Sequence, residues 1–271
     1  EDLGAMGDRT SMALIPADQL GRAAFAARSP GVVAGLPTLA LVAEAVDPKL
    51  LVETLVPDGT PLECGTRVAV ISGPLRSLLI AERTALNFLQ RLSGVATLTR
   101  KYVDAVAGTR AVVLDTRKTT PGWRLLEKYA VFMGGGQNHR IGLYDGILIK
   151  DNHLAGLGDP PTAIRTAVER ARAFPGNAGL PVEIEVDTLE QLDLALAVKP
   201  EIVLLDNMTC DQMRTAVARR DAVAPGVLLE ASGGVNLTTI RAIAETGVDR
   251  ISVGALTHSA PALDLGLDYE A

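Results

Sequence analysis

The chain has 271 residues, of which 48% are hydrophobic and 21% charged, so it can bury a full core and is not mainly disordered. Its 26 Lys and Arg residues against 32 Asp and Glu residues give a net charge of −6. This balance argues against a non-specific nucleic-acid binder or a basic membrane-surface protein, and any anionic ligand must bind in a local pocket of positive charge.

The two cysteines, Cys64 and Cys210, are too few and too far apart for a disulfide framework or a thiolate zinc site. The first residues contain neither the basic region nor the apolar stretch of an export signal, and no apolar run approaches the length of a membrane span. These features predict a cytoplasmic protein with no membrane partner. Because the chain starts with Glu1 rather than Met, we also expect a further segment upstream.

Turn residues punctuate the first part of the chain and separate short apolar runs such as residues 68–72, which predicts a small β-rich region. From Leu75 to Ala107 turns are sparse and apolar residues recur at helical spacing. We therefore expect a helical layer there, broken near Gly94 and ending near Gly108. Together these segments predict a first domain over residues 1–108.

From Ala111 onward, short β-branched runs alternate with longer helical patterns, as in parallel βα units. The predicted strands are Ala111–Asp115, Gly146–Lys150, Val182–Val186, Ile202–Leu205, Val227–Glu230 and Arg250–Val253. The predicted helices are Gly122–Met133, Pro161–Ala173, Leu189–Val198, Cys210–Arg220 and Leu237–Thr246.

Six strands fall short of the eight of a full α/β barrel, so residues 109–271 predict an irregular, incomplete six-stranded parallel barrel. A doubly wound open sheet is the structural alternative, but no strand is followed by a GxGxxG turn. We expect the last residues to pack back on the N-terminal domain.

Polar residues follow nearly every predicted strand, which is where parallel α/β folds place their active sites. They are Asp115–Lys118, Lys150–Asn152, Glu185, Asp206-Asn207, Glu230 with Ser232–Gly234, and Gly254. This distribution favours an enzyme over a structural module.

A basic cluster joins Arg117, Lys118, His139, Arg140 and Lys150, which predicts a substrate with several negative charges. Alternatively, Arg117 and Lys118 are a solvated pair on a loop. Lys150 ends an apolar run, where a buried lysine needs an anionic partner or forms a Schiff base with a carbonyl substrate.

The run Gly134–Gly136 before His139 indicates either a close approach of the backbone to a ligand or a flexible turn. Glu185 and Asp206 end successive strands, so they could hold Mg²⁺, transfer protons or form salt bridges to Lys150.

Small residues follow the last two strands and match the phosphate site of barrel enzymes. They are Ser232, Gly233 and Gly234 after one strand and Gly254 after the next. His258 either points at the same phosphate or caps the final helix.

At this point the sequence resembles the quinolinate phosphoribosyltransferase (carboxylating nicotinate-nucleotide pyrophosphorylase) family over nearly its whole length. The motifs that carry the resemblance are Glu82-Arg83-Thr84 with Asn87 and Leu92-Ser93-Gly94, Asp115–Thr119, Gly134–Gly136 with His139-Arg140, Leu148–His153, Glu183–Asp187, Leu205–Asn207, Glu230–Gly234 and Val253–His258. The resemblance implies an N-terminal α/β sandwich domain beside the irregular barrel. It also implies a homodimer, or a hexamer built from such dimers, in which Arg83 reaches the neighbouring active site.

The resemblance further implies the substrates quinolinate and phosphoribosyl pyrophosphate, the cofactor Mg²⁺ and a role in NAD biosynthesis. The implied catalytic residues are Lys118, Lys150, Glu185 and Asp206, the last two as metal ligands. The implied substrate-binding residues are Arg83, Thr116, Arg117, Lys118, His139, Arg140, Lys150, Ser232, Gly233, Gly234, Gly254 and His258. Among these, Lys118 would lie nearer the phosphoribosyl pyrophosphate, and the late glycines with Ser232 and His258 would hold its 5-phosphate.

Two alternatives stay open from the residues themselves, a Schiff-base barrel enzyme using Lys150 and a phosphosugar-binding module without catalysis. The resemblance leaves a third open, a molybdenum-locus homologue that shares the fold and many motifs. The full set of cations favours the carboxylate-binding branch over that homologue.

Overall fold

The computed structural model describes residues 2–270, which form two compact units. Unit 1 consists of residues up to 100, residues 126–135 and residues from 260 onward. Unit 2 consists of Lys101–Leu125 and Gly136–Ser259. Each unit is thus built from separated stretches of chain, whereas the sequence pattern suggested one boundary at residue 108.

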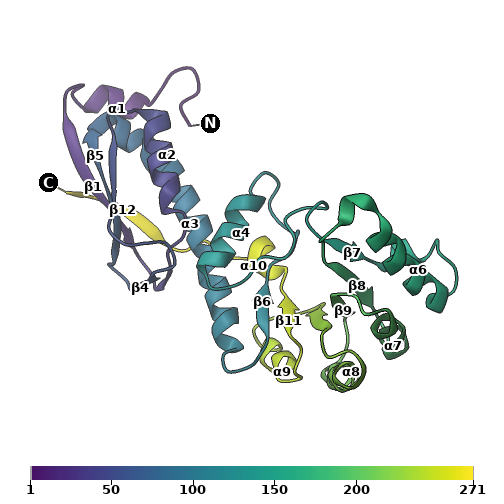
Figure 1. Cartoon of the computed structure of the whole chain (residues 1–271). Helices are drawn as coiled ribbons and strands as arrows, with labels where there is room; N and C mark the ends of the chain where they lie inside the picture. The colour runs from purple at the N-terminus through teal and green to yellow at the C-terminus, as the bar shows by residue number, and fades with distance from the viewer. Residues whose placement is uncertain (1, 271) are drawn as a thin grey trace. The chain divides into compact units, whose positions relative to one another are not determined.

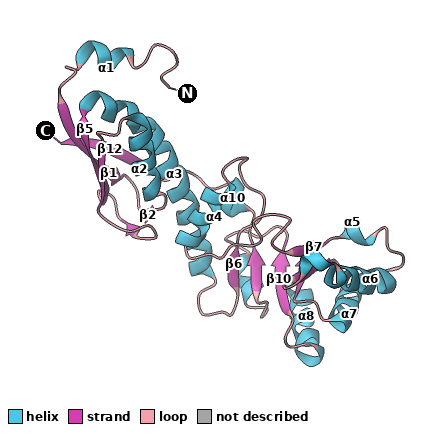
Figure 2. Cartoon of the chain, turned by 45° about the horizontal axis from the view of Figure 1, so that its top comes forward, coloured by secondary structure: helices cyan, strands magenta, loops and turns pink. Residues whose placement is uncertain are grey.

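Unit 1 contains a four-stranded antiparallel sheet with the strand order β12-β1-β5-β3. Its strands are β1 (Leu20–Ala27), β3 (Leu51–Thr54), β5 (Arg67–Pro74) and β12 (Leu265–Glu270), and a small pair is formed by β2 (Gly31–Val32) and β4 (Pro61–Leu62). Figure 2 shows the helices α1 (Arg9–Leu14), α2 (Leu36–Val46) and α3 (Leu75–Ala105) in this unit. The C-terminal strand β12 therefore completes a sheet that the N-terminal residues begin.

Helix α2 lies in the region that the sequence pattern assigned to β-structure, so that part of the prediction is wrong. Its N-terminus follows Gly35, which has a φ of 99°, and Pro37 stands in its first turn. Leu36, Leu39 and Val42 point into the core beside Phe25 of β1. The spacing of these three residues was a helical signal, but it was hidden among turn residues.

Helix α3 runs unbroken for 31 residues, so the predicted break at Gly94 is also wrong. A Cβ atom at this position would lie 2.0 Å from the carbonyl oxygen of Pro261. Gly94 therefore permits a close backbone approach inside unit 1 rather than a break in the helix.

Unit 2 contains a six-stranded parallel sheet with the order β6-β11-β10-β9-β8-β7 (Figure 1). The strands are β6 (Val112–Leu114), β7 (Ile147–Ile149), β8 (Val182–Val186), β9 (Ile202–Asp206), β10 (Leu228–Ser232) and β11 (Arg250–Ser252). The prediction of six parallel strands is confirmed. Within the described residues, β6 and β7 form the two ends of the row, so the barrel is not closed by strand pairing.

The remaining helices follow the strands in the predicted alternation. They are α4 (Arg124–Met133), α5 (Asp151–Leu154), α6 (Pro160–Ala173), α7 (Leu189–Val198), α8 (Cys210–Val223), α9 (Ile240–Ala244) and α10 (Ala255–His258), with a 3-10 turn at Pro175–Asn177. Thr188 and Thr209 cap α7 and α8 by accepting hydrogen bonds from Gln191 and Gln212. Across residues 2–270, no helix combines the length and apolarity needed to cross a bilayer.

Candidate active site

The strands of unit 2 direct their charged residues to one face of the sheet. In β8, Val182, Ile184 and Val186 alternate with Glu183 and Glu185, so the two carboxylates share a face. Glu185 is in register with Leu204 of β9, which is in register with Glu230 of β10, which pairs with Arg250 of β11. Glu185, Glu230 and Arg250 thus lie in one row across the sheet, with Leu204 between the two glutamates. The next row toward the strand ends contains Asp206, Ser232 and Ser252.

A cavity of about 550 Å³ lies above this face, at the carboxyl ends of the strands. The sequence-predicted residues that line it are Thr116, Arg117, Lys118, His139, Arg140, Lys150, Glu185, Asp206, Ser232, Gly233 and Gly234. Leu148, Leu204, Asn207, Glu230 and Ser252 complete the lining. The structure therefore brings most of the predicted residues together, although they come from five separate strand ends and one loop.

The cations of the cavity are close enough to affect one another. Burial and the nearby charge of Arg117 lower the pKa of Arg140 from its ordinary value. Arg140 also donates a hydrogen bond from Nη1 to the carbonyl oxygen of Gly146 at 3.1 Å, which fixes its direction. Two arginines that repel each other in one cavity are stabilised by an anionic ligand, and a planar carboxylate suits the guanidinium fork.

His139 is held from below by two buried glutamates. Its Nε2 atom lies 3.0 Å from Oε2 of Glu183 and 3.4 Å from Oε1 of Glu230, and Arg250 donates to the other oxygen of Glu230 at 2.7 Å. The backbone N–H of His139 donates to Asp115 at 2.8 Å. The ring position is therefore set by carboxylates from three strands or strand ends.

Two observations give opposite indications of the protonation state of the His139 ring. Burial opposes protonation, but the hydrogen bonds and charges of Glu183 and Glu230 outweigh it and raise the pKa of His139 to about 9. The N–H of Arg140, in contrast, donates to Nδ1 at 2.8 Å, which suits a neutral ring. The negative charges of two buried carboxylates lie beside Nε2 and favour the protonated ring, whereas only one local backbone contact favours the neutral ring. We therefore assign the ring as cationic at neutral pH.

His139, Glu183 and Glu230 place three potential metal ligands within 4.8 Å of one another. Arg250 already pairs with Glu230, and a cationic His139 compensates Glu183. A divalent ion would add positive charge to a group that is neutral without it. The charges of this cluster therefore balance internally, while Oε1 of Glu183 and Oε1 of Glu230 are buried without a hydrogen-bond partner within residues 2–270.

Glu185 and Asp206 are less buried than the carboxylates of Glu183 and Glu230. Lys150 Nζ lies 2.5 Å from Glu185, and Nδ2 of Asn207 donates to Asp206 at 2.8 Å. Both carboxylates face the cavity, and Mg²⁺ is commonly bound by one or two carboxylates together with water and substrate phosphates. The donor set fits Mg²⁺, and the salt bridge that was the structural alternative for Glu185 is also present.

The loop after β10 has a backbone that only small residues can adopt. Gly233 has a φ of 94°, and a Cβ atom there would lie 2.2 Å from Oδ1 of Asn207. Asn207 is itself left-handed, with a φ of 51°, and donates its N–H to the carbonyl of Ser232 at 3.0 Å. These two strand ends therefore interlock at the cavity.

The other predicted residues lie outside the cavity lining. Gly254 separates Lys118 from His258, because a Cβ atom there would lie 3.2 Å from Lys118 Cδ and 3.1 Å from His258 Nε2. Arg83 is exposed on α3 in unit 1. A Cβ atom at Gly134 would lie 2.5 Å from the carbonyl oxygen of Ala96 in α3, so this glycine permits close packing within unit 1.

Sequence reasoning missed the network of Glu183, Glu230 and Arg250 beneath His139, and the role of Asn207. A signal for Glu183 was present, because the alternation in residues 182–186 places it on the same face as Glu185. The partnership of Glu230 with Arg250 depends on strand register and has no local signal.

Comparison with known proteins identifies the family. The model of the quinolinate phosphoribosyl transferase N-terminal domain matches residues 8–93, and that of the C-terminal domain matches residues 95–268. A nicotinate-nucleotide pyrophosphorylase [carboxylating] of Mycobacterium leprae is 48% identical over 99% of this chain and 93% of its own length. A chloroplastic relative from Arabidopsis thaliana is 41% identical over 100% of this chain and 80% of its own.

Solved structures agree with this result. The nicotinate-nucleotide pyrophosphorylase from Francisella tularensis superposes with a TM-score of 0.90 at 39% identity, covering 98% of this chain and 91% of that one. The enzyme of that name from Ehrlichia chaffeensis gives a TM-score of 0.89 at 38% identity, covering 99% and 94%. The fold, the family models and the relatives agree that this chain belongs to the quinolinate phosphoribosyltransferase family.

Proposed function

We propose that the protein transfers the phosphoribosyl group from phosphoribosyl pyrophosphate to quinolinate, with Mg²⁺ as cofactor and with loss of CO₂, and so makes nicotinate mononucleotide for NAD biosynthesis. The observation that carries this proposal is the cavity in which Arg117, Arg140, Lys118 and Lys150 gather in an acidic protein. A ligand with two adjacent carboxylates and a second ligand with several phosphates would neutralise these cations.

In this proposal, Arg117, His139, Arg140 and Lys150 bind the quinolinate carboxylates. Lys118 lies beside Gly254 and His258, and it would contact the phosphoribosyl donor there. Thr116, Ser232, Gly233 and Gly234 also line the cavity, and the backbone N–H groups of the glycine loop suit a phosphate.

The pyridine nitrogen of quinolinate would attack C1 of the ribose while the C1–O bond to pyrophosphate breaks. The quaternised ring then loses its 2-carboxylate as CO₂, because the positive nitrogen stabilises the electron pair left at C2, which takes up a proton. The residues of the cavity supply orientation and charge rather than a covalent intermediate.

Glu185 and Asp206 would hold Mg²⁺ together with pyrophosphate oxygens. When bound, the ion offsets the negative charge that develops on the leaving group. Lys150 would leave its ion pair with Glu185 to contact the substrate.

We further propose that the protein works as a homodimer, or as a hexamer built from such dimers, in the cytoplasm. Arg83 is an exposed arginine on α3, and its place in a family motif supports a role in the neighbouring subunit's site. Arg83→Ala should inactivate the protein, and mixed dimers with an Arg140→Ala subunit should regain part of the activity. Absence of rescue in verified mixed dimers would place Arg83 in its own subunit's site.

The decisive experiment mixes the protein with quinolinate, phosphoribosyl pyrophosphate and Mg²⁺, and follows CO₂ and pyrophosphate release. Nicotinate, which lacks the second carboxylate, is the control acid. Equal release of both products with quinolinate alone supports the proposal. Silence in folded, dimeric protein would refute it and favour the molybdenum-locus homologue or a binding module.

A further inference from the structure

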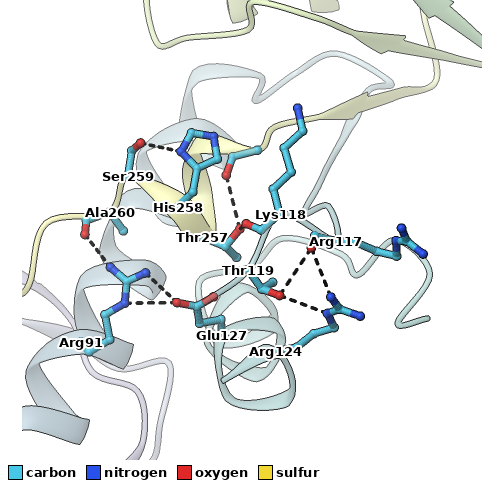
Figure 3. A network of polar contacts seen from close by, with 11 residues as sticks. Arg91, Arg117, Lys118, Thr119, Arg124, Glu127, Thr257, His258, Ser259 and Ala260 are labelled. Carbon is cyan, nitrogen blue, oxygen red and sulfur yellow. Dashed lines mark hydrogen bonds and ion pairs between the residues drawn. The ribbon is translucent and has the colours of Figure 1, made fainter. Parts of the chain in front are cut away.

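The loop that carries Arg117 and Lys118 is held by side chains from two directions (Figure 3). Thr257 in α10 donates its hydroxyl to the carbonyl oxygen of Lys118 at 2.7 Å. Arg124, the first residue of α4, donates from Nε to the hydroxyl of Thr119 at 3.0 Å and makes a longer contact of 3.4 Å with the carbonyl of Arg117. The two neighbouring carbonyls of Arg117 and Lys118 thus have different partners.

Arg124 also reaches a second loop of the site. Its Nη1 atom donates to the carbonyl oxygen of Ile141 at 3.1 Å. Ile141 follows Arg140, so one guanidinium links the backbone beside Arg117 to the backbone beside Arg140. Only arginine offers several donors in one rigid plane, and lysine could satisfy one of these acceptors at a time.

Thr257 serves a different part of the site. It precedes His258, and its hydroxyl contacts both Lys118 and the carbonyl of Gly254 at 3.3 Å. Figure 3 shows Lys118 and His258 rising beside each other from these two segments. Thr257 therefore ties Lys118 to the segment proposed to bind phosphate.

We propose that Arg124 and Thr257 are positioning residues with separate duties, Arg124 for the diacid and Thr257 for the phosphoribosyl donor. Arg124 sets the spacing between Arg117 and Arg140 and so the affinity for the diacid. Thr257 sets Lys118 against the Gly254–His258 segment and so the affinity for the donor. This inference rests on the proposed function, and it predicts that two partly buried contacts, made by residues far apart in the chain, affect different substrates.

The test is steady-state kinetics with each substrate varied in turn. Arg124→Lys keeps the charge but removes the fork, and it should raise the KM for quinolinate roughly tenfold while the KM for the donor changes less than about twofold. Thr257→Val keeps the shape and removes the hydroxyl, and it should raise the KM for the donor about three- to tenfold with little change for quinolinate. Thr257→Ser should restore the donor KM.

Arg241→Lys is the matched control, because Arg241 also donates to a main-chain carbonyl, that of Ala107 at 2.9 Å, but does not line the cavity. Both KM values should stay unchanged in this variant. If Arg124→Lys does not fold, Thr119→Val removes the acceptor of its 3.0 Å bond and carries the same expectation on a smaller scale.

The crossed pattern of KM changes would support the inference. Equal changes in both KM values, or a lower melting temperature with unchanged KM values, would overturn it and leave both residues as structural. An inactive wild-type protein would overturn the proposed function and this inference together, so the two failures are distinguishable.

Discussion

Two layers of charged side chains on the same sheet face differ in whether their charges are compensated. In the lower layer, Glu183, Glu230, His139 and Arg250 are largely buried and neutralise one another. At the rim, Arg117, Lys118, Arg140 and Lys150 face the cavity, and of these four only Lys150 forms an ion pair with a carboxylate within residues 2–270. Charges that compensate each other hold the fold, whereas a surplus of one sign marks a place for a ligand.

Removing a charge from the lower layer should give the largest effect on stability. Glu230→Ala leaves Arg250 and His139 without their shared carboxylate, and breaking a buried ion pair costs about 3–5 kcal/mol. Urea unfolding of the variant measures this loss. Asp193→Ala, which breaks an exposed pair with Arg219, is the control and should cost less than about 1 kcal/mol. Equal costs would mean that the lower layer contributes no more to stability than an exposed ion pair.

Removing a charge from the rim should spare the fold and weaken binding. Arg140→Ala deletes one cation of the surplus, and a charge-assisted hydrogen bond contributes about 1.5–3 kcal/mol, so quinolinate affinity should fall roughly 10- to 150-fold. Lys150→Ala should act in the same direction. Calorimetric titration with quinolinate measures the change, with Arg172→Ala at the surface as the control. Unchanged affinity in both rim variants would contradict the assignment of the cavity.

Removing a carboxylate from the rim should affect metal dependence instead. Glu185→Ala and Asp206→Ala should each raise the Mg²⁺ concentration needed for half-maximal activity by about tenfold or more, with quinolinate binding preserved. Activity measured over a series of Mg²⁺ concentrations gives the result. If the dependence on Mg²⁺ stays that of the wild type, Glu185 and Asp206 serve only as partners of Lys150 and Asn207.

The lower layer should also give a modest pH dependence of stability. The pKa of His139 is raised to about 9, above the roughly 6.5 of an unfolded chain, so its contribution is complete below about pH 6.5 and is lost as the pH rises through 9. The free energy of unfolding should therefore differ more between wild type and His139→Gln at pH 6 than at pH 10. A difference that is the same at both pH values would indicate a neutral ring, as the contact between Arg140 N–H and Nδ1 suggests.

Sequence patterns alone are enough to predict the alternation of strands and helices in unit 2 and the family of the chain. Period-two alternation in residues 182–186 and the polar residues after each strand are local patterns, so they can be recognised without knowing which residues are in contact. Sequence patterns also identified the cations and carboxylates that line the cavity. They did not reveal helix α2, because its helical spacing overlaps with turn residues.

Which charges are compensated depends on contacts that exist only in the tertiary structure. Strand register places Arg250 beside Glu230, and the chain brings His139 onto Glu183 from a distant loop. The sequence pattern predicted a helix break at Gly94, and at Gly134 either a close approach to a ligand or a flexible turn. Both residues are small because another backbone passes close to them. Such roles depend on contacts between residues far apart in the chain, and local sequence patterns carry no information about those distances.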